Sequence, residues 1–147
     1  MKHRLAFAVI ALLYLAFFLP AIGSVHLFDW DEINFAEAAR EMMVSGDWLN
    51  VTINFEPFWE KPPLFIWLQA ISFSVLGISE FAARLPNVII GFFTLLVLYR
   101  ATELRYSGKA ALTAVLLYLG SFTSQLYFKT GIIDPLFNLF IFLSTSL

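Results

Sequence analysis

The sequence predicts an all-α integral membrane protein, on the basis of three observations. Apolar residues make up 60% of the 147 residues, against about 45–50% in a soluble domain. Charged residues make up only 14%, against about 25%. The apolar residues also gather in runs of the length that membrane helices need. Cysteine is absent, and a net charge of −2 gives no indication of nucleic-acid binding.

The first predicted span covers about residues 5–23 and follows the basic residues Lys2 and Arg4. The run is long enough to cross a hydrocarbon core of about 30 Å as a helix. Basic residues at its start place the N-terminus in the cytoplasm. The alternative is a cleaved signal peptide, because 21–23 is an acceptable small-residue cleavage site. Further membrane segments downstream favour the span.

An external loop is predicted next, over 24–85, because its first part is acid-rich. Residues 24–62 carry eight acids and two bases, which fits the non-cytoplasmic side of a membrane. Within it, 32–45 predicts a short helix. Asp29 and Glu32 have the spacing of a capping box, and Gly46 is a natural C-terminal stop.

This short helix is expected to be amphipathic and to lie along the membrane interface. At about 100° per residue, its polar stripe holds Asn34, Glu37 and Glu41. Its apolar side holds Phe35, Ala39, Met42 and Met43.

Charge decides how the following apolar segments are placed. The segment 64–77 is too short to span as a helix. The basic cluster of Arg100, Arg105 and Lys109 should be cytoplasmic. We therefore interpret 64–77 as interfacial or re-entrant, and 86–104 as a span that runs inward.

A third span is predicted at about 110–128, which returns the chain to the outer side. Lys129 and Asp134 then lie outside, and a fourth segment starts at 135 and heads inward. The apolar run that ends at Leu147 is too short to cross the bilayer. We therefore expect the N-terminal part of a longer multispan protein.

Four residues are candidates for chemistry: Asp31, Glu60, Lys61 and Asp134. Asp31 can act as a general base or metal ligand at the membrane surface, or merely favour the start of a helix. Lys61 precedes a rigid Pro-Pro step and suits an anionic lipid phosphate, or is an ordinary snorkelling lysine. Asp134 lies at the mouth of a span, either as a functional acid or as an N-cap before Pro135.

These clusters together resemble a known family. DWDEINFAEAAREMMVSGDW, then FWEKPPLFIWLQAISFSVLGISEFAARLP, then an isolated Asp134 resemble the membrane glycosyltransferases of the C type (GT-C). The resembling branch contains the bacterial aminoarabinose (lipid A) transferases and the protein O-mannosyltransferase-like proteins. The resemblance covers about 25–90 in sequence, and 91–147 in hydropathy.

The resemblance implies a multispan helical bundle with periplasmic juxtamembrane helices, located in the bacterial inner membrane. It implies inverting transfer of a sugar from a polyprenyl-phosphate donor to a lipid or protein acceptor. In this role Asp31 and Asp134 match the catalytic aspartates, Lys61 matches the residue that contacts the donor phosphate, and Glu60 matches a position that can hold a divalent metal ion. Asn34-Phe35 stand where the aminoarabinose branch often has Arg-Tyr, which leaves the sugar and the acceptor open.

Two other classes of function stay open from the sequence. A transporter or flippase-like protein would use intramembrane acids as coupling sites, whereas the acids here gather in one external loop. A non-catalytic membrane subunit is the other alternative. We expect the 147-residue chain alone to be inactive as a glycosyltransferase, since its pockets would need further helices.

Overall fold

The structure, a computed structural model, describes residues 2–28 and 30–146, without the side chains of 2–4 and 7. Helices dominate the described part of the chain, and one short hairpin interrupts them. The elements in chain order are α1 (Lys2–Phe18), α2 (Asp31–Ser45), β1 (Thr52–Ile53), β2 (Glu56–Pro57), α3 (Leu64–Leu76), α4 (Glu80–Arg105), α5 (Gly108–Leu119), α6 (Phe122–Tyr127) and α7 (Asp134–Ser146).

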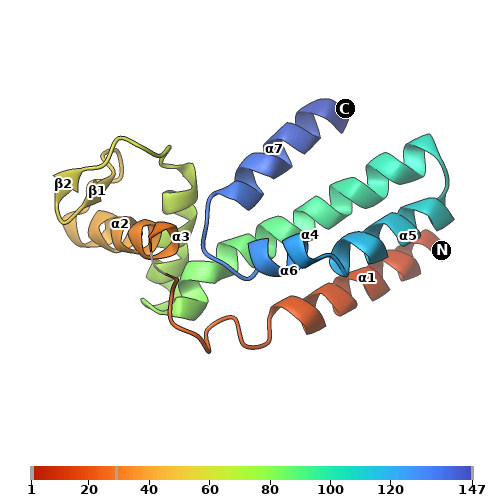
Figure 1. Ribbon diagram of the computed structural model, residues 1–147, viewed down its shortest axis with the longest axis horizontal. Helices are drawn as coiled ribbons and strands as arrows, with labels where there is room; N and C mark the ends of the chain where they lie inside the picture. The colour runs from red at the N-terminus through yellow and green to blue at the C-terminus, as the bar shows by residue number, and fades with distance from the viewer. Residues whose placement is uncertain (1, 29, 147) are drawn as a thin grey trace.

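Two regions share the long helix α4 (Figure 1). The first, which we name the cap, consists of α2, the β1–β2 hairpin and α3, and packs on the N-terminal end of α4. The second, which we name the bundle, consists of α1, α5 and the rest of α4, which run side by side. Helix α6 continues from α5, and α7 packs against α4. Each region has its own apolar cluster of buried side chains.

Helix α4 is the described helix that is long and apolar enough to cross a membrane. Its 26 residues extend about 39 Å at 1.5 Å per residue. Pro86 lies within it and cannot donate to the carbonyl of Ala82. The Ser72 hydroxyl of α3 donates to that carbonyl instead, at 2.7 Å. The cap therefore supplies a hydrogen bond that the proline leaves open.

The predicted short helix over 32–45 is confirmed as α2. Gly46 ends it in the left-handed region at φ 71°, and its N–H donates to the Met42 carbonyl. Asp29 lies outside the described residues. Glu41, which was placed on the polar stripe of this helix, is fully buried against the hairpin, and the sequence did not predict that burial.

Three predicted spans have different helix boundaries in the structure. The span expected over 86–104 lies within the longer helix α4. Helix α1 ends at Phe18, short of the expected 5–23. The expected 110–128 helix is divided into α5 and α6, because the Ser121 and Ser124 hydroxyls donate to the Tyr118 carbonyl and start a new helix. The segment 64–77 is one helix, α3, which contacts α2 and α4. The crossing of a membrane by α1, α4, α5 and α7 stays a prediction.

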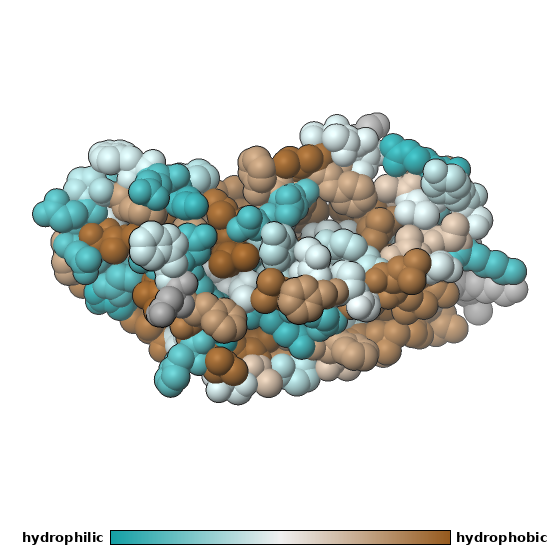
Figure 2. Space-filling model, in the orientation of Figure 1, coloured by the Kyte–Doolittle hydropathy of each residue, from teal (hydrophilic) through white to brown (hydrophobic). Residues whose placement is uncertain are grey.

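Polar and apolar side chains separate along the molecule. Figure 2 shows hydrophilic side chains over the end that carries α2 and the hairpin, and hydrophobic side chains over the length of α1. The basic residues Arg100, Arg105 and Lys109 lie around the α4–α5 turn, at the end of α4 away from the cap. The acid-rich and base-rich parts of the described chain therefore occupy opposite ends.

Candidate functional site

Asp31 is the first residue of α2, and a strained turn precedes it. Trp30 has a positive φ of 76° with ψ −103°, a conformation that costs a non-glycine residue about 1–3 kcal/mol. The Phe28 N–H donates to Glu32 Oε2 at 2.7 Å and closes this turn. The Asp31 side chain is half-buried. Its backbone is thus fixed by its neighbours on both sides.

Glu32 forms a buried ion pair with Arg84 of α4. Arg84 Nε and Nη2 donate to the two carboxylate oxygens at 2.7 and 2.9 Å, and the side chains are 1% and 3% exposed. The remaining bonds of the guanidinium go to the carbonyls of Ile22, Val25 and His26. Such a pair is compatible with burial because every donor is satisfied. It joins α4 to the segment between α1 and α2.

The same carboxylate also holds the loop before Asp134. Glu32 Oε1 accepts the Gly131 N–H at 2.5 Å. A side chain at Gly131 would be crowded, since a methyl group on it would lie 3.0 Å from Gln69 Nε2 and 3.1 Å from the Ala83 carbonyl oxygen. Glu32 therefore joins the two segments that carry Asp31 and Asp134.

Two buried amides complete the attachment of this loop. Asn87 of α4 donates to the carbonyls of Thr130 and Ile132, at 2.6 Å each. Gln69 of α3 donates to the Ala83 carbonyl at 2.8 Å and reaches the Gly131 carbonyl at 3.5 Å. Asp134 itself is exposed and begins α7. Its backbone position is thus set by side chains from three helices.

Lys61 lies beside the N-terminal half of α2. Its Nζ is 5.8 Å from the centre of the Phe35 ring, within the range of a cation–π contact. Phe35 follows Asp31 by one helical turn, so both side chains project from one face of α2. Phe35 also packs edge-on against Phe65 of α3, with ring centres 5.9 Å apart. The structure thus brings Lys61 to the face of α2 that carries Asp31.

Glu60 is exposed and neighbours Lys61 in the chain. Across 2–28 and 30–146, no group of three or more His, Asp or Glu side chains is arranged to hold a metal ion. Glu60 could thus supply one ligand of a metal site. The other ligands are not grouped around it among the described residues. Its metal role stays a prediction.

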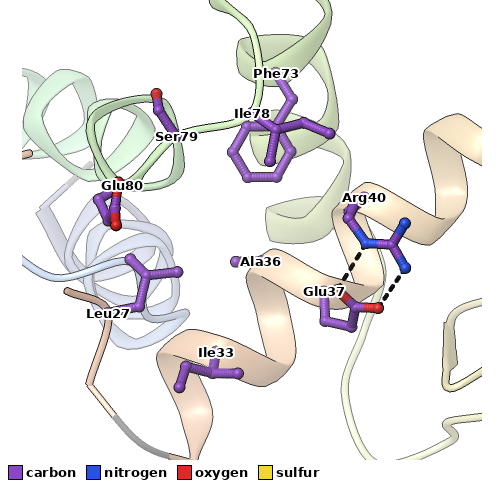
Figure 3. A pocket seen from close by; sticks show the side chains of 9 residues that line it. All are labelled: Leu27, Ile33, Ala36, Glu37, Arg40, Phe73, Ile78, Ser79 and Glu80. Atoms are coloured by element: carbon purple, nitrogen blue, oxygen red, sulfur yellow. Dashed lines mark hydrogen bonds and ion pairs between the residues drawn. The ribbon is translucent and has the colours of Figure 1, made fainter.

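A cavity of about 290 Å³ opens on the other side of α2 (Figure 3). Ile33, Glu37 and Arg40, which line it, project about half a turn around the helix from Asp31. Arg40 Nε and Nη2 donate to the two oxygens of Glu37 at 2.8 and 2.6 Å. This guanidinium lowers the pKa of the Glu37 carboxyl. The four predicted site residues do not line this cavity.

The sequence alone did not identify the polar residues that hold the site together. Glu32 was interpreted as part of a helix cap, and Arg84 was only one position of the predicted external loop over 24–85. Gln69 and Asn87 carried one usable signal, because each is an amide within an apolar segment, where a buried polar group needs a partner.

Residues 60–147 match the model of the family described as dolichyl-phosphate-mannose-protein mannosyltransferase. The chain belongs to this family. The undecaprenyl phosphate-alpha-4-amino-4-deoxy-L-arabinose arabinosyl transferase of Edwardsiella ictaluri is 30% identical over 140 residues, which cover 95% of this chain and 25% of that protein. A Proteus mirabilis protein of the same description is 33% identical over 128 residues, which cover 86% and 23%.

Two solved structures have the same fold over this length. ArnT from Cupriavidus metallidurans bound to undecaprenyl phosphate matches with a TM-score of 0.87 at 24% identity, over 95% of this chain and 26% of that one. The apo state of the same protein gives a TM-score of 0.88. The chain spans about a quarter of the length of these relatives. The resemblance to C-type membrane glycosyltransferases of the aminoarabinose transferase branch is confirmed.

Proposed function

We propose that this chain is part of a membrane glycosyltransferase that takes a sugar from a polyprenyl-phosphate donor. The observation that carries the proposal is the contact of Lys61 with Phe35, which follows Asp31 by one turn of α2. A cation and a carboxylate near the same face of one helix suit a reaction in which a phosphate leaves and a nucleophile loses a proton. The names of the relatives support this donor, since they describe undecaprenyl-phosphate-dependent arabinosyl transferases.

Lys61 takes the leaving-group side of the reaction. As the bond between the anomeric carbon and the phosphate oxygen breaks, negative charge grows on the phosphate. The Lys61 ammonium stabilises this charge by a charge-assisted hydrogen bond. The contact with Phe35 limits the positions of an otherwise flexible side chain, which reduces the entropy lost when the donor binds.

Asp31 takes the acceptor side. An acceptor O–H attacks the anomeric carbon from the face opposite the phosphate, and its proton passes to the Asp31 carboxylate. One displacement on the opposite face inverts the anomeric centre. Asp134 is the second catalytic aspartate of the proposal, and the Glu32 carboxylate links its loop to the Asp31 turn.

The acceptor is a lipid or a protein, and the reaction takes place at the outer face of the inner membrane. Charge supports this orientation, because Arg100, Arg105 and Lys109 lie at the opposite end from the cap, and basic ends face the cytoplasm. The transporter alternative required ionisable groups midway along the spans. The buried charges Glu32, Glu41 and Arg84 instead lie in the cap or where it meets α4.

Substitution in the full-length protein tests the proposal. Asp31→Asn and Lys61→Ala should each abolish sugar transfer from a polyprenyl-phosphate sugar in detergent, while membrane insertion stays normal. Asp47→Asn is the matched control for Asp31, since Asp47 is exposed and bonds only within its own turn. Lys109→Ala is the control for Lys61. Normal transfer by both site variants would overturn the proposal.

A further inference from the structure

We propose that Glu41 is a positioning residue for Lys61, which it holds in place through the β1–β2 hairpin. The inference rests on the proposed role of Lys61 as the donor-phosphate contact. Glu41 and Asp31 belong to the same helix, so this arrangement would fix the phosphate contact and the base on one rigid element. Three features of the structure carry the inference: the burial of Glu41, the strain in the hairpin turn, and the short path from the hairpin to Lys61.

Glu41 is fully buried, which is costly for a carboxylate unless its bonds repay the lost hydration. Its Oε2 accepts the Thr52 hydroxyl at 2.6 Å and the Phe55 N–H at 3.0 Å. Both donors belong to the hairpin, one in β1 and one in its turn. The other oxygen, Oε1, has no hydrogen-bond partner. Both hydrogen bonds that Oε2 accepts therefore hold the hairpin.

The hairpin needs such a contact because its turn is strained. Asn54 and Phe55 have φ of 56° and 59°, as the two central residues of a type I′ turn require. Asparagine tolerates this conformation, but a phenylalanine there costs free energy that a glycine would not. The bond from the Phe55 N–H to Glu41 falls on the strained residue itself. The carboxylate therefore stabilises a turn that the local sequence disfavours.

The hairpin leads directly to Lys61. Phe58 N–H donates to the Val51 carbonyl at 2.8 Å and closes the base of the hairpin. Three residues later the chain reaches Lys61, and the rigid Pro62-Pro63 step then leads into α3. Lys61 thus lies in a short segment between the hairpin, which Glu41 holds, and the start of α3. Loss of Glu41 would free the hairpin side of this segment and leave the α3 side in place.

A nitroxide spin label on the hairpin measures the mobility of the hairpin directly, whether or not the protein transfers sugar. Cysteine is absent from these 147 residues, so Glu56→Cys, at an exposed position of β2, gives one labelling site in this region. Glu41→Ala should raise the mobility of the label. Glu41→Gln should leave it low, because an amide oxygen can accept the same two bonds. Val44→Ala, at an exposed position of the same helix, is the control and should also leave it low.

The affinity for undecaprenyl phosphate in detergent then measures whether Lys61 is correctly positioned. Glu41→Ala should weaken binding about tenfold, the effect of disturbing one charge-assisted hydrogen bond, and should raise KM for the donor more than it lowers kcat. Phe55→Gly should restore much of this loss in the Glu41→Ala background, because glycine adopts the turn without help. The Glu41→Ala/Lys61→Ala variant should bind no more weakly than Lys61→Ala, because the two residues act through one contact.

The two measurements separate the possible failures. Unchanged label mobility in Glu41→Ala would contradict the attachment of the hairpin by Glu41. Raised mobility with weaker binding only in Lys61→Ala would overturn the positioning of Lys61 and leave the proposed function standing. Raised mobility with normal binding in both variants would overturn the proposed role of Lys61, and the positioning with it.

Discussion

The cap and the bundle are held together by different interactions. In the cap and where it meets α4, buried polar side chains make specific bonds over long sequence separations, as Glu32 does with Arg84 and Gly131. In the bundle, aromatic rings and a glycine fit together by shape. Directional bonds fix the orientation of each partner, whereas apolar packing tolerates exchange of side chains of similar volume. The cap is therefore suited to hold side chains in fixed positions, as the proposed roles of Asp31 and Lys61 require, and the bundle supports it.

The bundle core centres on aromatic contacts against α4. Tyr14 of α1 stacks on Phe18 with ring centres 4.5 Å apart, and Phe128 packs edge-on against Phe18 at 5.8 Å. Gly91 of α4 faces this group, and a methyl group on it would lie 2.6 Å from Phe128 Cγ. The absence of a side chain at Gly91 lets the rings approach the helix backbone.

The largest expected effect comes from breaking the buried pair. Arg84→Met should destabilise the full-length protein by about 3–5 kcal/mol, because it leaves the Glu32 carboxylate buried without its cation. Thermal unfolding in detergent measures this, and sugar transfer should be lost. Arg84→Met/Glu32→Gln should recover part of the stability, since no buried charge remains. Arg40→Ala removes a partly exposed pair and should cost less than about 1 kcal/mol. Equal losses in Arg84→Met and Arg40→Ala would contradict the comparison.

Gly91→Ala tests the bundle and should destabilise it by about 1–3 kcal/mol through overpacking. Phe128 would have to move away from α4, and it lies only three residues before Gly131. The matched control is Gly120→Ala, where the nearest atom to an added methyl group is 3.5 Å away. Thermal unfolding of both variants in detergent is the measurement. A loss of stability in Gly120→Ala as large as in Gly91→Ala would show that shape at Gly91 is not the cause.

The sequence predicted the local features of the cap because local rules govern them. Periodicity and the turn preference of Gly46 predicted α2 to within one residue at its start. Its buried face was predicted correctly for Phe35 and Met42. The burial of Glu41 was not predicted. The hairpin that covers it bonds it through residues more than ten positions later in the chain, and local rules do not reach that far.

The long-range bonds of the site could not be predicted from local rules. A buried carboxylate and a capping carboxylate look the same in sequence, and Glu32 meets Arg84 across 52 residues. The division of 110–128 into two helices also depends on where the Ser121 and Ser124 hydroxyls bond, which hydropathy does not report. Charge and position made Asp31, Glu60, Lys61 and Asp134 candidates, and the family resemblance gave them roles that stay predictions.

Tyr14→Phe should have a smaller effect, confined to the bundle. The Tyr14 hydroxyl donates to the Val88 carbonyl at 2.6 Å in a buried position, and Pro86 lies two residues earlier in α4. Removal of one such bond costs about 0.5–1.5 kcal/mol, while the ring stacking with Phe18 is kept. Thermal unfolding in detergent measures the loss, and sugar transfer should persist. A loss of transfer would show that the bundle positions the site as strictly as the cap does.

The smallest expected effect is the pH dependence of the Glu37–Arg40 pair. Hydrogen bonding to Arg40 lowers the pKa of Glu37 below its usual 4.5, so the folded state binds this proton less readily than the unfolded state. The pair therefore contributes stability above pH 4.5, and the contribution is lost as the pH falls through the lowered pKa. The difference in melting temperature between the unchanged protein and Arg40→Ala should be small at pH 7 and should shrink on acidification. A difference that grows at acid pH would have the wrong sign, because protonation of Glu37 removes the charge that Arg40 stabilises.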